Sequence, residues 1–234
     1  PVLRAQRSLH LIAGMHYDFI AWERPFRFTA EAYGKFFDRL VPYIVDNVRL
    51  IYYGGNIAEG YSAGLDFRVN GEFVKGVESW FSLSFMKSEM KIPSLNSGWY
   101  PSPFDQRVNF SVFFQDYLPG HPDFRAHINI AFETGVPTSP PEKEQWDIWF
   151  RMPPYRRVDI GFSQVIIGGA KRGPGPVIKE LTAGLEVFNL ADIRNTISYT
   201  WIRTVRNSEG KSLGYAVPNY LTSRSLNLKI TVRF

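Results

Sequence analysis

Hydrophobic and polar residues alternate along most of this chain of 234 residues. From Leu226 to Phe234 every second residue is apolar, and each residue between them is polar. A two-residue period places apolar side chains on one face of a β-strand, whereas the 3.6-residue period of a helix does not produce it. The stretch therefore predicts an amphipathic strand.

The same alternation recurs upstream and predicts nine strands in all. The other segments are residues 9–18, 26–33, 63–70, 81–85, 107–115, 125–133, 157–163 and 181–201. Alternation in the last of these is mostly kept across Asn189–Asp192. We therefore predict one strand over 181–201, roughly 70 Å long at ~3.3 Å per residue, instead of two strands and a turn.

The connections between the predicted strands alternate in length. The short ones, 19–25, 71–76, 117–123 and 168–177, contain turn residues, whereas the long ones, 40–59, 87–104, 135–154 and 204–223, are polar and aromatic. This alternation is typical of an up-and-down meander whose two ends face different environments, as in outer-membrane barrels.

Three features favour a membrane barrel over a soluble β-sandwich. The predicted strands are long for a small sandwich. The apolar face is rich in Phe while the other carries charges, and aromatic residues gather near strand ends, as at a membrane interface. The fold class predicted for residues 1–234 is thus all-β, a portion of an antiparallel up-and-down transmembrane β-barrel.

Composition and charge exclude several other classes. Aromatic residues make up 16% of the chain, which argues against disorder, and no cysteine is present to form disulfides or bind metal. No apolar run approaches the ~20 residues of a membrane helix. The net charge of +5 comes from scattered basic residues, so we expect no nucleic-acid partner. No targeting leader is visible after Pro1.

Enzymatic chemistry has little support. Ser111 and His127 are predicted on the polar face of neighbouring strands, but no third group that would orient them is identifiable. His10 and His16 lie too far apart on one strand to share a metal ion. No glycine-rich phosphate loop leads from a strand into a helix. We expect no catalytic residues, no metal and no cofactor.

Four stretches resemble the C-terminal part of the barrel of TonB-dependent outer-membrane receptors. Gly184–Asp192 is similar to the family's signature in the penultimate strand, with Ala191 where Phe is usual. Residues 215–234 resemble the last loop and closing strand, with Ser223-Arg224 in place of Gly-Arg. Asp105–Pro119 and Tyr155–Asp159 resemble strand starts of such receptors.

The resemblance implies a 22-stranded barrel closed by an N-terminal plug. The nine strands would then be the last nine, with the plug, the TonB box and ~13 strands absent. An open sheet leaves two unpaired edges, which lipid does not tolerate. We therefore expect the chain to be a fragment or one of two pieces of a barrel. The expected partners are outer-membrane lipid, the rest of the barrel, the TonB complex through the plug, and the outer-membrane insertion machinery.

Three groups of residues are candidate sites. The loop aromatics suit stacking on a sugar, siderophore or peptide, with loop packing or membrane anchoring as the alternative: Trp99, Tyr100, Trp146, Trp149, Tyr215 and Tyr220. Four arginines are candidates to contact the plug or line the lumen, or to pair with Asp66, Glu133 and Asp159: Arg68, Arg107, Arg125 and Arg157. Phe234 resembles the C-terminal signal that the insertion machinery reads.

The leading hypothesis is a receptor that imports a scarce ligand (a siderophore, vitamin, glycan or peptide) across the bacterial outer membrane. The alternatives are a passive porin-like channel, a small stand-alone outer-membrane barrel, and a soluble β-sandwich that binds a ligand. Aromatic loops fit many ligands, so the sequence does not identify the one that is bound.

Overall fold

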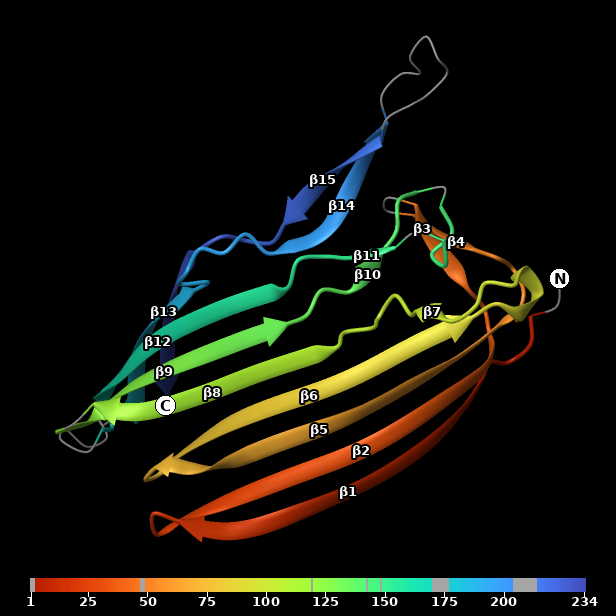
Figure 1. The fold of residues 1–234 in the computed structure, drawn as a ribbon. Helices are drawn as coiled ribbons and strands as arrows, with labels where there is room; N and C mark the ends of the chain where they lie inside the picture. The colour runs from red at the N-terminus through yellow and green to blue at the C-terminus, as the bar shows by residue number, and fades with distance from the viewer. Residues whose placement is uncertain are drawn as a thin grey trace.

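Nine long antiparallel strands form one sheet in the computed structural model, which describes residues 3–46, 49–118, 120–141, 143–147, 149–169, 177–203 and 214–234 (Figure 1). In order across the sheet they are β1 (Arg7–Ala21), β2 (Arg24–Leu40), β5 (Ala58–Val74), β6 (Val77–Lys91), β8 (Val108–Leu118), β9 (His121–Glu133), β12 (Tyr155–Ile167), β13 (Glu180–Phe188) and β16 (Ser225–Arg233). Each long strand pairs with the next one along the chain, so the predicted up-and-down topology is confirmed.

The remaining strands are short and lie in the connections. β3 (Tyr43–Asp46) pairs with β4 (Arg49–Tyr52), and β14 (Thr196–Arg203) pairs with β15 (Gly214–Tyr220). β10 (Pro137–Thr138) pairs with β11 (Phe150–Arg151), while β7 (Tyr100–Pro101) adds to the end of β6. A 3-10 turn spans Pro93–Leu95, and none of the described residues forms a helix long and apolar enough to cross a membrane.

The strand register aligns the apolar positions into continuous rows. One row crosses the sheet through Tyr17, Phe28, Val69, Phe81, Val112, Ile130 and Val158. The adjacent row reaches the last strands through Ile160, Val187 and Leu226. A slip of one residue would move a strand's apolar set to the other face. The shared register therefore gives the sheet one apolar face and one polar face.

The apolar face is not covered by another layer of the described chain. Leu65, Phe85 and Leu185 keep 41–47% of their surface exposed within the sheet, and Leu228 on the edge strand β16 keeps 71%. The buried apolar residues among those described lie instead at strand ends and in loops: Phe26, Ala58, Val77, Ile92 and Tyr100. A β-sandwich would bury its apolar faces between two sheets. The sandwich alternative is therefore not supported, and the strand-rich fold is compatible with a β-barrel membrane protein.

The prediction of one strand over 181–201 is wrong. β13 ends at Phe188, and Asn189 and Asp192 take the left-handed conformation with φ of 53° and 52°. The Asn189 side chain closes this turn, since its Oδ1 accepts from the Ile193 amide at 3.0 Å and its Nδ2 donates to the Ile193 carbonyl at 2.9 Å. β14 then pairs with β15, outside the nine-stranded sheet. The signature-like residues 189–192 thus form a turn after the penultimate long strand.

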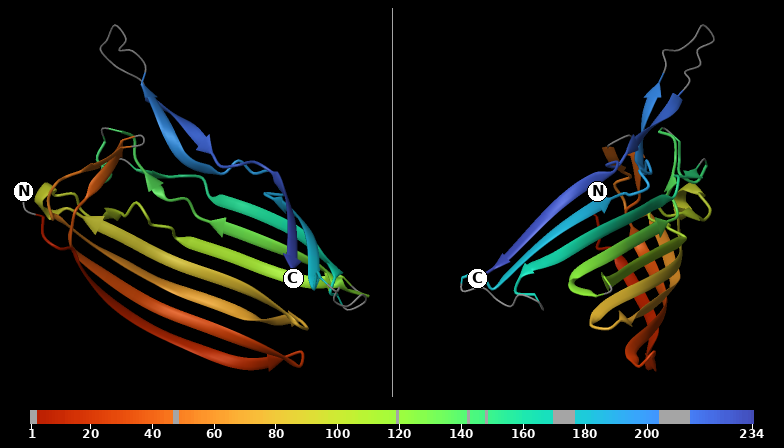
Figure 2. Two further views of the ribbon diagram at one scale, coloured as in Figure 1. Left: turned by 180° about the vertical axis from the view of Figure 1, so that it is seen from behind. Right: turned by 90° about the vertical axis from the view of Figure 1, so that its left-hand side faces the viewer.

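The two ends of the sheet differ, as the alternating connections predict (Figure 2). At one end β1 and β2 join through Trp22 and Glu23 alone, both at positive φ as a type I′ turn requires. Aromatic rings gather beside this turn, where Phe26 lies 5.5 Å from Phe19 and 4.9 Å from Phe73 between ring centroids. The opposite end carries the long loops with the short strands. We call these the turn end and the loop end.

Candidate functional site

The loops fold over the polar face at the loop end and enclose a cavity of about 320 Å³. Phe37, Met86 and Ser88 contribute to its walls from the polar face of the strands. Tyr43 and Phe104 line it from two different loops. Phe104 keeps 69% of its surface exposed, so an aromatic ring remains free at this cavity. A mostly apolar cavity with few polar groups is the usual form of a small-molecule site.

A small aromatic core holds these loops together. Tyr100 is 3% exposed and packs against Trp146, with 5.6 Å between ring centroids. Trp146 also contacts Tyr53 at 6.3 Å, and the Tyr53 hydroxyl donates a hydrogen bond to Glu144. Residues 53, 100 and 146 belong to three different connections, so this contact fixes the loops relative to one another.

The electrostatics of this core favour neutral phenols. Burial raises the pKa of the Tyr100 hydroxyl, and the nearby Glu144 carboxylate adds to the shift. The pKa of Tyr53 is also raised, first by burial and then by its hydrogen bond to Glu144. Both hydroxyls therefore stay protonated at neutral pH, and Tyr53 keeps the proton that it donates to Glu144.

A buried carboxylate ties the loop end together from a second side. Asp105 is fully buried, and its Oδ1 accepts a hydrogen bond from the Ser88 amide at 2.6 Å. Its Oδ2 accepts from Arg107 Nε at 2.7 Å and from Arg151 Nη2. Arg151 also donates to the Asp105 and Gly135 carbonyls, at 2.7 and 3.0 Å. Because a buried charge is tolerated only when it is paired and hydrogen-bonded, Asp105 locks three segments in place.

The aromatic residues predicted to bind ligand do not form one site. Tyr100 and Trp146 belong to the buried loop core, the alternative role considered from the sequence. Trp99 lies 5.3 Å from the Tyr61 ring, and the Trp149 ring has the Arg151 guanidinium at 5.8 Å. Tyr215 and Tyr220 lie on β15 and are 52% and 51% exposed. The exposed rings remain candidates for ligand contact.

Three of the four predicted arginines lie on the polar face. Arg68 stacks on Trp80 at 5.3 Å, and Arg125 stacks on Tyr117 at 5.1 Å. Arg157 pairs with Asp159 at 2.6 Å, as the pairing alternative expects. Arg107 differs, because it precedes β8, binds Asp105 and lies 3.9 Å from Glu89. Its acidic partners among the described residues are therefore Asp105 and Glu89, not the predicted Asp66, Glu133 or Asp159.

Phe234 follows β16, is 75% exposed, and has its carbonyl bound by the Lys179 ammonium at 3.2 Å. The Ser111–His127 pair does not form, since Ser111 lies opposite Ala131 while His127 lies opposite Gln115. Four residues of strand separate these two levels by ~13 Å. No group of three potential metal-binding side chains occurs among the residues that the structure describes.

Sequence reasoning did not single out Asp105, Arg151, Tyr53 or Glu144 as functional residues. Asp105 begins the stretch Asp105–Pro119 that resembles a strand start, and nothing in the sequence connects it to Arg151. The local sequence signal for this ion pair is limited to Arg107, which follows Asp105 by two residues. The contact between distant loops is visible only in three dimensions.

Comparisons with protein-family models, with curated proteins and with solved structures return no match for this chain.

Proposed function

We propose that this chain forms part of the barrel wall and the external loops of a bacterial outer-membrane receptor that takes up a scarce ligand in a TonB-dependent manner. The observation that carries the proposal is the set of continuous apolar rows across nine paired strands, in which side chains such as Leu65 and Phe85 remain exposed in mid-sheet. Only an apolar medium stabilises such a surface, because in water each exposed Leu or Phe forgoes ~1.5–3 kcal/mol. A lipid bilayer supplies that medium.

The unpaired edges favour a larger barrel than these nine strands form by themselves. Within the described residues β1 pairs only with β2, and β16 pairs only with β13. Backbone groups left unpaired in hydrocarbon cost several kcal/mol each, so membrane sheets close on themselves. We therefore propose that further strands complete a 22-stranded barrel around a plug, the size that the resemblance implies. The turn end then faces the periplasm.

The loop end supports ligand capture from outside the cell. It has a cavity beneath two loops and exposed aromatic rings at positions 104, 149, 215 and 220. Asp105 and the Tyr100–Trp146 core pre-organise the loops, which lowers the entropy cost of binding. This chain holds the ligand and forms the wall, while the plug, driven through TonB, opens the path.

A test of this proposal separates the receptor from a passive channel. The complete protein is expressed in an outer membrane, and uptake of labelled iron chelates, cobalamin and oligosaccharides is measured with and without TonB. The proposal expects the protein in the outer-membrane fraction and uptake of at least one class that stops without TonB. Uptake of small solutes that continues without TonB would favour the channel. Recovery in the soluble fraction would contradict both.

A second test concerns Phe234. We propose that its exposed ring at the end of β16 is read by the outer-membrane insertion machinery. Deletion of Phe234 should lower the amount of heat-modifiable barrel in the membrane. Replacement of Leu226, a similarly exposed residue of β16, by Ala is the control and should have a smaller effect. Equal insertion of both variants would contradict the role.

A further inference from the structure

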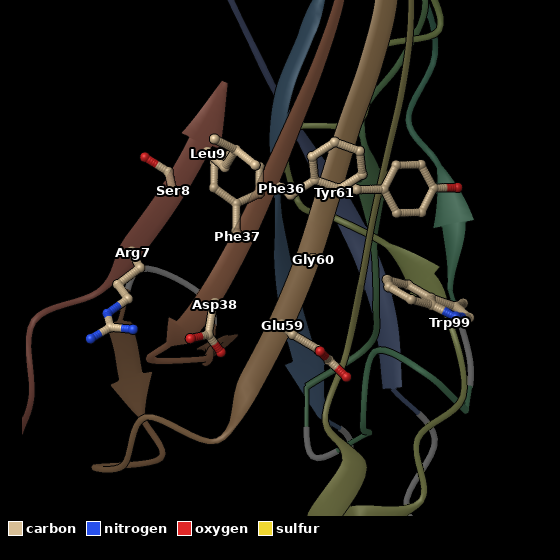
Figure 3. A pocket seen from close by; sticks show the side chains of 10 residues that line it. All are labelled: Arg7, Ser8, Leu9, Phe36, Phe37, Asp38, Glu59, Gly60, Tyr61 and Trp99. Carbon is tan, nitrogen blue, oxygen red and sulfur yellow. The ribbon is translucent and has the colours of Figure 1, made fainter. Parts of the chain in front are cut away.

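A second hollow lies at the loop end, mainly on the apolar face, and its lining shares Phe37 and Gly60 with the cavity described above. It has a volume of about 600 Å³ and is formed by β1, β2, β5 and the loop that carries Trp99 (Figure 3). Because it opens on the side that the proposed function assigns to lipid, we call it the rim groove. None of the predicted ligand contacts except Trp99 belongs to it.

The rim groove has an apolar and a polar level, which follow from the strand register. Leu9, Phe36 and Tyr61 stand opposite one another on β1, β2 and β5 and continue the apolar rows. Leu9 and Phe36 are 60% and 51% exposed. Arg7 and Asp38 face each other two residues nearer the loops, at the same level as Glu59 (Figure 3). Next to Tyr61, β6 places Glu89, which accepts a hydrogen bond from the Tyr61 hydroxyl at 2.6 Å and pairs with Lys87 at 2.9 Å. Over β1 and β2, a molecule lying along the groove therefore meets Leu9 and Phe36 first and the charges of Arg7 and Asp38 next.

The charges of the polar level leave one cation without a counter-ion. Asp38 pairs with Arg39 at 3.6 Å, and Glu59 pairs with Lys91 at 2.9 Å. The Lys91 ammonium also lies 4.8 Å from the Trp99 ring centre. Within the described part of the chain Arg7 forms no ion pair, and its side chain is exposed. The net charge at this level is +1, because three cations (Arg7, Arg39 and Lys91) stand beside two carboxylates (Asp38 and Glu59).

An unpaired guanidinium beside an apolar slot defines a specific ligand chemistry. Guanidinium binds phosphate through two parallel hydrogen bonds and is weakly hydrated, so it suits a phosphate at a membrane surface. Tryptophan and tyrosine rings, here Trp99 and Tyr61, are favoured at the level of lipid headgroups. On β1 and β2 the order of the levels, hydrocarbon toward mid-sheet and charge toward the loops, matches a lipid lying in the leaflet.

We propose that the rim groove binds a phosphorylated lipid of the surrounding membrane leaflet. Its phosphate binds Arg7, its acyl chain lies along Leu9 and Phe36, and Trp99 packs at the junction. The proposal rests on the proposed function in one respect, namely that the apolar face meets lipid. It assigns a lipid site to the outer side of the wall, whereas the imported ligand is proposed to bind in the cavity beneath the loops.

The test uses the complete protein in detergent and two short-chain lipids that differ only in phosphate: dioctanoyl phosphatidic acid and dioctanoylglycerol. Binding is measured by native mass spectrometry. Arg7→Gln should raise the dissociation constant of phosphatidic acid ~10-fold, because it removes a charge-assisted bidentate contact. Arg7→Lys keeps the charge but loses the bidentate guanidinium geometry. Its dissociation constant for phosphatidic acid should therefore lie between those of Arg7→Gln and the wild type.

The matched control is Lys35→Gln. Lys35 is a cation of β2 near the same end, but on the polar face, where it stacks on Tyr33 at 5.0 Å. Lys35→Gln changes the net charge of the protein by the same amount as Arg7→Gln. It should change the dissociation constant of phosphatidic acid less than ~2-fold. A heat-modifiable band on electrophoresis checks that each variant folds.

Three results would overturn the rim groove as a lipid site. Equal losses in Arg7→Gln and Lys35→Gln would show a general charge effect. Equal binding of dioctanoylglycerol would show that phosphate is not recognised. Displacement by 10 mM inorganic phosphate, which we expect to have no effect, would show a free-anion site instead. Failure of the proposed function is seen separately, as absence of the protein from the membrane fraction.

Discussion

The middle of the sheet and the loop end are stabilised in opposite ways. In mid-sheet, Leu65 and Phe85 stand side by side and are 45% and 41% exposed. At the loop end, Ile92 and Asp105 are completely buried, and Tyr100 nearly so. The loops thus build a core and a buried ion network of their own, while the sheet depends on its surroundings to cover its apolar face. Substitutions in the two regions should therefore respond differently to the surrounding medium.

The largest effect is expected from a charge in the middle of the apolar face. Leu65→Arg should destabilise the protein in a bilayer by ~2–4 kcal/mol, the cost of arginine on the lipid face of a barrel near mid-membrane. Ser84→Arg is the matched control, since Ser84 lies on the adjacent strand and the opposite face, beside Asp66. Urea unfolding in lipid vesicles measures both. Similar costs at the two positions would remove the distinction between the faces.

Loss of the buried carboxylate should have a smaller effect, confined to the loop end. Asp105→Asn removes the charge that Arg107 and Arg151 share and should cost about 2–3 kcal/mol of local stability. Asp38→Asn is the control, because its pair with Arg39 is long and exposed and is expected to contribute below ~1 kcal/mol. Hydrogen exchange of the Ser88 amide reports the change. Unchanged protection of the Ser88 amide in Asp105→Asn would contradict the role of Asp105 in holding the loop end together.

The sequence predicted the sheet better than the loops, for a physical reason. Each long strand keeps its period because one face is apolar throughout, as in Leu226–Phe234. The error over 181–201 arose because alternation continues by chance through a turn, which Asn189 closes with its own side chain. The buried Asp105 carboxylate connects residues 88, 105 and 151, and no local sequence pattern predicts that these residues lie close together.

A modest gain in stability is expected at the turn end. Glu23 holds φ of 60° in the two-residue turn, a conformation that costs a residue with a side chain ~1 kcal/mol and glycine nothing. Glu23→Gly should therefore stabilise the hairpin by ~0.5–1 kcal/mol, measured by urea unfolding. Glu72→Gly, at a strand position without positive φ, serves as the control and should destabilise. Destabilisation by Glu23→Gly would contradict the turn geometry.

The smallest effect is a pH dependence at the loop end. The pKa values of Tyr53 and Tyr100 are raised, so folding favours the protonated phenols. Their contribution is complete below the ordinary tyrosine pKa of ~10 and is lost as pH rises above it. Absorbance at 295 nm and near-ultraviolet circular dichroism, followed between pH 8 and 12, should show the packing of the loop core loosen as the two phenols ionise. In the double variant Tyr53→Phe, Tyr100→Phe this loss of packing should occur at a higher pH. Normal titration of both phenols would contradict the loop core.

The most direct test of the lipid-facing apolar surface is a spin-label scan along β5. The chain contains no cysteine, so a single cysteine at each of positions 63–69 in turn carries the label without a background. Odd positions share the face of Leu65 and Phe67, so in lipid vesicles labels there should collide more often with oxygen. Even positions share the face of Asp66, so labels there should collide more often with a water-soluble nickel complex. A two-residue period of this sign is the predicted result. No period, or the opposite sign, would contradict the account.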